Sequence, residues 1–212
     1  MRKLGKMGWM AVTMLASFGA QAQPLKIVEV NAPKVNCVFQ TDCNIPVSDS
    51  TGIIAMPFLA SPKTAWLQSR TYSGEAGAPG AGTIGYEYRI SLTQASGAGC
   101  LMGFNLNFGP HKPLPYANNT NADVFVITTG GLGTIGLKSA ERTGDVIQFT
   151  LASPICADGP ADIKKTTFFF GLAATNAPMH INSTIYGIGD PAFFAVDARV
   201  PTHSVPMNPG DP

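Results

Sequence analysis

The stretch Tyr86-Glu87-Tyr88-Arg89-Ile90-Ser91-Leu92-Thr93 alternates apolar and polar side chains without a break. Successive side chains of a β-strand point to opposite faces, so this alternation predicts a strand. One face would carry Tyr86, Tyr88, Ile90 and Leu92, and the other Glu87, Arg89, Ser91 and Thr93. We therefore expect a strand with one face in a hydrophobic core, as is typical of an antiparallel sheet.

Further strands are predicted on both sides of this stretch. Residues 100–108 repeat the alternation, with Cys100, Met102, Phe104, Leu106 and Phe108 on one face. The other candidates are Leu25–Val30, Val35–Phe39, Ile53–Leu59, Ala65–Tyr72, Val124–Ile127, Val146–Leu151, Phe168–Phe170, Ile181–Tyr186 and Ala192–Val200. The continuous apolar runs at Val124–Ile127 and Phe168–Phe170 suit central strands, and Pro57 suits an edge or a bulge.

The order of these elements predicts an all-β fold. Turn-forming segments separate the strands, and the best helical candidate is the short segment Leu137–Arg142. About ten short strands with turns between them are typical of a two-sheet antiparallel β-sandwich, of jelly-roll or immunoglobulin-like type. We expect one domain over residues 23–200 and a flexible, proline-rich C-terminal tail over residues 201–212.

Residues 1–22 have the features of a secretory signal peptide. Arg2, Lys3 and Lys6 form a basic region, residues 7–19 are uncharged, and Ala20-Gln21-Ala22 resembles a cleavage site. The uncharged stretch is shorter than the roughly 20 apolar residues of a membrane-spanning helix, so we expect cleavage and no membrane span afterwards. The sequence thus predicts a secreted or periplasmic protein, and the short signal suits a bacterium.

All four cysteines, Cys37, Cys43, Cys100 and Cys156, lie in the part that would be exported. An even number of cysteines in an oxidising compartment predicts disulfides. Of the possible pairings we favour Cys37–Cys43, around a turn between two short strands, and Cys100–Cys156, between distant segments. A metal site is the weaker alternative, because the chain has no C-x-x-C pair and its histidines are scattered.

Composition and charge exclude several classes of protein. Charged residues make up 13% of the chain, about half of the usual share of roughly 25%, which disfavours coiled coils and helix bundles. Cleavage after residue 22 would leave 11 basic and 13 acidic residues, a net charge of −2. We therefore expect no nucleic-acid partner.

Asn119, Asn121 and Asp123 have the spacing of the first three ligands of an oxygen-ligand calcium loop. The segment departs from that pattern, since it has one carboxylate and since Leu132 stands where the last glutamate would be. Asparagine and aspartate are also common in turns without a metal, because they bond to their own backbone. Calcium at these three residues is the one cofactor that the sequence suggests.

Motifs that would identify an enzyme are incomplete. The pattern G-x-G-x-x-G occurs at residues 80–85 and 131–136, but without the strand and long helix that a nucleotide site needs. Neither G-x-S-x-G nor H-E-x-x-H occurs, and we expect His111, His180 and His203 to be surface residues. Glu75 and Glu87 could form a glycosidase pair, but Glu87 has a plainer role as an ion-pair partner of Arg89 or of a neighbouring strand.

The aromatic residues suggest one class of ligand. Trp66 and the tyrosines fall on or beside strands, where they could form a platform for carbohydrate, although packing in the core is the more common role.

We expect a non-enzymatic exported module with a binding or surface-structural role, whose unknown partner could be a carbohydrate or a protein surface. The alternatives are a small secreted hydrolase acting on polysaccharide or peptide, and a calcium-dependent adhesion domain. The stretches Gln68–Leu92, Gly130–Gly136 and Phe168–Leu172 are similar in style to secreted bacterial β-proteins, which implies no defined activity.

Overall fold

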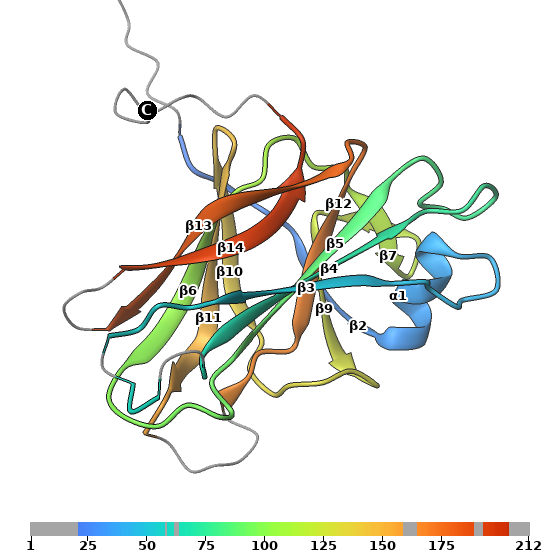
Figure 1. Ribbon diagram of the computed structural model, residues 1–212. Helices are drawn as coiled ribbons and strands as arrows, with labels where there is room; N and C mark the ends of the chain where they lie inside the picture. The colour runs from blue at the N-terminus through green and yellow to red at the C-terminus, as the bar shows by residue number, and fades with distance from the viewer. Residues whose placement is uncertain (1–20, 58, 62–63, 159–164, 189–192, 204–212) are drawn as a thin grey trace, which may run out of the picture.

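The computed structural model describes residues 21–57, 59–61, 64–158, 165–188 and 193–203. Most of these residues lie in two six-stranded sheets that pack face to face, so the predicted all-β sandwich is confirmed (Figure 1). Most of the predicted signal peptide and most of the predicted tail lie outside the described residues. The helix of the described part is short, and no helix there is long and apolar enough to cross a membrane.

The first sheet, sheet A, is antiparallel throughout. Its order is β1 (Gln23–Pro24), β10 (Leu137–Thr143), β11 (Val146–Cys156), β6 (Cys100–Asn107), β13 (Pro178–Ile188) and β14 (Phe193–Pro201). The helix predicted at Leu137–Arg142 is wrong, because this segment is strand β10 between β1 and β11. Pairing on both sides satisfies its backbone groups, and Ala140 is buried in the core.

The second sheet, sheet B, has the order β2 (Ile27–Asn31), β9 (Val124–Thr129), β12 (Phe169–Ala174), β5 (Ile84–Ser91), β4 (Trp66–Ser73) and β3 (Ser48–Ile53). The predictions of central strands at Val124–Ile127 and Phe168–Phe170 are confirmed, since β9 and β12 each have a neighbour on both sides. Strands β2 and β9 run parallel, whereas the other pairs of this sheet are antiparallel. The strand predicted at Ile53–Leu59 is wrong, because β3 ends at Ile53 and residues 54–56 form a tight turn.

The main core lies between the two sheets. Tyr86, Tyr88 and Ile90 of β5 are fully buried there, and Glu87 and Arg89 lie on the opposite face of sheet B, as the alternation predicted. In β6 a shift of register between Leu101 and Gly103 places Leu101 rather than Met102 in the core. The cysteine itself is half-buried, at the end of its strand.

A third layer covers part of the outer face of sheet B. It consists of helix α1 (Ala32–Phe39) and the hairpin of β7 (Leu114–Ala117) and β8 (Thr120–Ala122) (Figure 1). Side chains of this layer pack on the outer face of sheet B in a second hydrophobic cluster, which includes Val35, Val38, Phe39, Tyr116, Phe125 and Ala173.

The strand predicted at Val35–Phe39 is wrong, because the segment belongs to α1. The side chain of Asn31 accepts a hydrogen bond from the backbone N–H of Lys34 and thereby caps the helix, and a proline occupies its first turn. Val35, Val38 and Phe39 have helical spacing and share one buried face.

Both favoured disulfide pairings are present. Cys37–Cys43 connects α1 to the turn that follows it, rather than two strands as predicted. Cys100–Cys156 joins directly paired residues of β6 and β11.

The first residues of the predicted tail contact the rest of the fold. Pro201 ends β14, and Thr202 and His203 are hydrogen-bonded.

Candidate functional site

A hollow of about 400 Å³ opens on the outer face of sheet B, next to helix α1. Its polar lining comes from Asn36 of the helix and from Arg70, Tyr72 and Glu87 of β4 and β5. Apolar side chains form the remaining walls, and these include Ala32, Ile45, Val47, Ile127, Leu132 and Phe169. The hollow exists because α1 covers only part of the sheet.

The charged residues of the site form a row across three strands. Asp49 in β3 lies opposite Arg70 in β4, and Arg70 lies opposite Glu87 in β5. Opposite charges alternate along this row, which stabilises neighbouring strands. The next strand, β12, places Gly171 opposite Glu87, so no side chain continues the row there.

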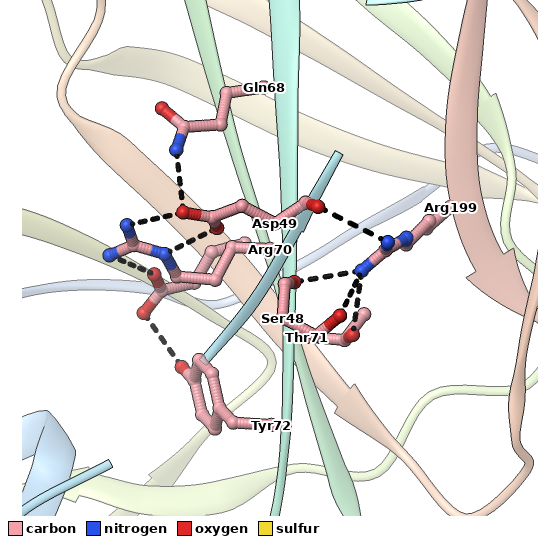
Figure 2. A network of polar contacts seen from close by, with 8 residues as sticks. Ser48, Asp49, Gln68, Arg70, Thr71, Tyr72 and Arg199 are labelled. Atoms are coloured by element: carbon pink, nitrogen blue, oxygen red, sulfur yellow. Dashed lines mark hydrogen bonds and ion pairs between the residues drawn. The ribbon is translucent and has the colours of Figure 1, made fainter. Parts of the chain in front are cut away.

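Asp49 and Arg70 form a two-pronged ion pair. The guanidinium Nε and Nη2 atoms of Arg70 donate hydrogen bonds of 2.8 and 3.1 Å to the two carboxylate oxygens of Asp49. Gln68 donates a third bond to the same carboxylate. The hydrogen bond from Arg70 holds the pKa of Asp49 below its usual value, so this carboxylate is ionised at neutral pH. Figure 2 shows Gln68 and Arg70 gathered around Asp49.

Glu87 is a carboxyl group with 3% of its surface exposed. The hydroxyl of Tyr72 donates a hydrogen bond of 2.7 Å to its Oε1 atom, and Nη1 of Arg70 lies 4.0 Å from its Oε2 atom. Burial raises the pKa of Glu87 to about 7, although Tyr72 and Arg70 both act to lower it. Glu87 therefore exchanges its proton near neutral pH, which is unusual for a carboxyl group.

Gly85 makes room for the tyrosine of this site. Gly85 lies opposite Tyr72 in the β4–β5 pair, and the aromatic ring of Tyr72 occupies the space where a Cβ atom of residue 85 would be. With its ring placed over the glycine, Tyr72 reaches Glu87 and also packs edge-on against Phe39 of α1. A residue without a side chain thus helps to fix the hydrogen bond to the buried carboxyl group.

Phe169 links two arginines of the outer face. The guanidinium group of Arg70 lies 4.6 Å from the centre of its ring, and that of Arg89 lies 5.1 Å from it. Arg89 also lies over the ring of Trp66, at 5.0 Å. The predicted ion pair of Glu87 is therefore made with the neighbouring strand, through Arg70, while Arg89 stacks on aromatic rings.

The predicted calcium ligands lie in and after the β7–β8 hairpin. Asn119 is in its turn, with a positive φ of 56°, Asn121 is in β8, and Asp123 follows that strand. The two carboxylate oxygens of Asp123 contact the backbone N–H of Lys26 and the ring of His111, at 2.7 and 2.9 Å. A calcium ion at Asp123 would have to compete with these contacts, and calcium binding there remains a prediction.

Two of the three histidines pair with aspartates. His180 contacts Asp197 at 2.7 Å, and its other ring nitrogen faces Arg199. His111 contacts Asp123, and its other nitrogen faces Arg142. In a hydrolytic triad that second nitrogen would face a serine or cysteine. His203 is held between the carbonyl oxygen of Pro201 and the side chain of Asn107.

The two glutamates considered as a glycosidase pair have different surroundings. Glu75 is exposed and accepts hydrogen bonds from the backbone and the hydroxyl of Thr41, which lower its pKa. Of these two glutamates, only Glu87 lines the hollow.

Among the aromatic residues, Tyr86, Tyr88 and Tyr116 are buried in the hydrophobic clusters and offer no ring surface to a ligand.

Comparisons of the chain with known protein families, with curated proteins and with solved structures found no match. A function is therefore inferred from the geometry of the hollow. Sequence reasoning selected Glu87 but missed Asp49, Arg70 and Tyr72 as its neighbours. The signal that could have indicated them is the alternation over β4, which places Gln68, Arg70 and Tyr72 on one face.

Proposed function

We propose that the protein is an exported, non-enzymatic binding module, and that the hollow on the outer face of sheet B holds a small ligand. The observation that carries this proposal is the placement of the buried carboxyl group of Glu87 in the lining of the hollow. Sites for small molecules are concave and mostly apolar, have volumes of roughly 300 to 1,000 Å³, and contain a few convergent polar groups. The hollow has each of these features.

Export is supported by the two disulfides, because such bonds persist in oxidising compartments. The signal peptide proposed for residues 1–22 would deliver the chain there. The fixed ion pair of Asp49 and Arg70 supports a binding role as well, since it holds Arg70, which lines the hollow, in one geometry before a ligand arrives.

A thermal melt of the mature protein against a library of small molecules tests this proposal. A compound that binds only the folded state at 100 times its dissociation constant stabilises it by about 2.7 kcal/mol, which is a readable shift. The variant Asn36→Trp places an indole in the lining of the hollow, and Lys34→Trp places the same group at an exposed position of α1. We expect hits to shift the wild type and Lys34→Trp but not Asn36→Trp. Equal shifts in all three proteins would place the ligand elsewhere.

A hydrolase acting on polysaccharide or peptide is the second candidate. One observation favours it: a carboxyl group with a pKa of about 7 can serve as a general acid at neutral pH. A glycosidase would need a second free carboxylate, and Asp49 is engaged by Arg70. Turnover of a bound substrate that is lost in Glu87→Gln, with binding retained, would favour the hydrolase over the binding module.

A further inference from the structure

We propose that the ligand of the hollow is an organic cation, in which a primary ammonium group contacts the carboxylate of Glu87 and an apolar body contacts the walls. This inference rests on the proposed function, because it names the ligand class of the same site. It follows from the open acceptor atom of Glu87, from the charge of the lining and from the apolar rim.

The Oε2 atom of Glu87 is an open hydrogen-bond acceptor among the described residues. Its partner Oε1 receives the hydrogen bond of Tyr72, whereas among the described residues no group donates a hydrogen bond to Oε2. Arg70 comes within 4.0 Å of Oε2, but its Nε and Nη2 atoms donate to Asp49. A carboxylate accepts several hydrogen bonds, so this buried group has capacity left for a donor in the hollow.

The hollow has few charged groups in its lining. Among the described residues, Arg70 and Glu87 are the charged side chains in the lining of the hollow, and Arg70 makes its closest ion pair with Asp49. Ionised Glu87 therefore shares Arg70 with Asp49, and no other described residue of the lining supplies a second cation. Arg89 is on the same strand, but it stacks on Trp66 and Phe169 and does not line the hollow.

Tyr72 and Tyr116 also lie near Glu87, but both are buried phenols whose pKa values are raised, so they remain neutral. A buried carboxylate that shares its cation with a second carboxylate is only partly balanced, and a cation in the hollow would reduce that penalty. A neutral or anionic ligand would not.

The walls and the rim of the hollow are largely apolar. Val47 and Leu132 line the hollow and yet have 46% and 58% of their surface exposed. An apolar body that extends from the ammonium group toward solvent would cover both side chains. Deeper in the hollow, Ile127 and the ring of Phe169 offer apolar contact.

Calorimetry with three ligands of equal chain length tests the proposal: n-hexylamine, 1-hexanol and hexanoate, each at pH 8 with the mature protein. We expect hexylamine to bind at least about tenfold more tightly than hexanol. A hydrogen bond between charged groups contributes more free energy than a hydrogen bond between neutral groups. Hexanoate should bind most weakly. Glu87→Gln should remove the preference for hexylamine, since its amide oxygen still accepts from Tyr72 but carries no charge. Glu75→Gln is the matched control, as it removes an exposed carboxylate outside the hollow.

A pH series on the wild type provides a test that needs no variant. Because burial raises the pKa of Glu87 to about 7, the fraction of ionised Glu87 increases from pH 6 to pH 8. Hexylamine should therefore bind about tenfold more tightly at pH 8 than at pH 6, and the gain should level off above pH 7. An affinity for hexylamine that does not change over this range would overturn the proposal even if Glu87→Gln failed to fold.

The outcomes separate this inference from the proposed function. If hexanol or hexanoate binds as tightly as hexylamine and Asn36→Trp blocks this binding, the inference of a cationic ligand is wrong. The proposal that the hollow is a binding site is then retained. Failure of hexylamine to bind would also overturn the inference of a cationic ligand. The proposed function fails separately, if no compound of the wider library binds in a way that Asn36→Trp prevents.

Discussion

The guanidinium group of Arg199 donates a hydrogen bond of 2.8 Å to the backbone carbonyl oxygen of Ser48, across a sequence separation of 151 residues. Arg199 is in β14, at one edge of sheet A, and Ser48 is in β3, at one edge of sheet B. The same guanidinium group also donates to the hydroxyls of Ser48 and Thr71 and to the carbonyl oxygen of Asp49. In Figure 2, Arg199 and Arg70 approach the Ser48–Asp49 segment from opposite sides. One side chain therefore joins the two sheets beside the row of Asp49, Arg70 and Glu87.

Arg199→Ala should lower the free energy of unfolding by about 1 to 3 kcal/mol, because it leaves several acceptors at the sheet edges without their charged donor. Arg199→Lys should fall between the alanine variant and the wild type, since one ammonium group cannot reach every acceptor that the planar guanidinium reaches. Urea denaturation measures both values. Lys138→Ala is the control, since it removes an exposed cation of β10. If Arg199→Ala were as stable as Lys138→Ala, the contacts between the sheet edges would contribute nothing to stability.

Glu87 should make the protein less stable as the pH rises from about 5 to 8. Its pKa is 4.5 in the unfolded chain and about 7 in the folded protein. Between these values the folded protein holds a proton that the unfolded chain has released, so the free energy of unfolding falls with rising pH and then levels off. The variant Glu87→Gln lacks this loss, and its stability relative to the wild type should rise by roughly 2 to 3 kcal/mol between pH 5 and pH 8.

Urea denaturation at four pH values measures this difference, and Glu75→Gln provides the control. The folded-state pKa of Glu75 is lowered rather than raised, so the stability that it contributes is lost only at more acidic pH. The profiles of Glu75→Gln and the wild type should therefore run parallel from pH 5 to pH 8. Parallel profiles for Glu87→Gln would mean that the carboxyl group is not held in its protonated form by burial.

The two disulfides should contribute unequally to stability. Cys100–Cys156 closes a loop with a sequence separation of 56 residues, and Cys37–Cys43 closes one with a separation of 6. In the loop-entropy model the first contributes about 4 kcal/mol and the second about 2 kcal/mol. Paired replacement of each by serine, followed by urea denaturation, measures both contributions. Equal losses, or a larger loss for the short loop, would contradict this order.

The sequence predicted the faces of the strands better than their neighbours. Alternation assigned Tyr86 and Tyr88 to the core and Glu87 to the outer face, because a strand that is buried on one side has a period of two. Nothing in that pattern gives the register between strands. The row of Asp49, Arg70 and Glu87 depends on pairing across three strands, and no local signal shows it.

The two errors in helix prediction have one physical cause. Local preference at Leu137–Arg142 suggested a helix, but the neighbouring strands β1 and β11 offer ladder hydrogen bonds on both sides. At Val35–Phe39 the apolar side chains suggested a strand, but Asn31 caps a helix and the outer face of sheet B binds its buried stripe. In both segments the tertiary partner decides the outcome. The hollow beside α1 could not be predicted because the helix that borders it was not.

Gly85→Ala should destabilise the protein through the ring of Tyr72. An added Cβ atom would overlap that ring, which would have to move away from Glu87 and Phe39. We expect a loss of about 1 to 3 kcal/mol, as for other overpacked sites. In a Tyr72→Ala background the overlap is absent, so the same glycine substitution should cost much less, and a double-mutant cycle by urea denaturation measures the coupling. Gly136→Ala is the control, since a Cβ atom there meets nothing closer than 3.8 Å. A cycle without coupling would show that Gly85 does not act by accommodating Tyr72.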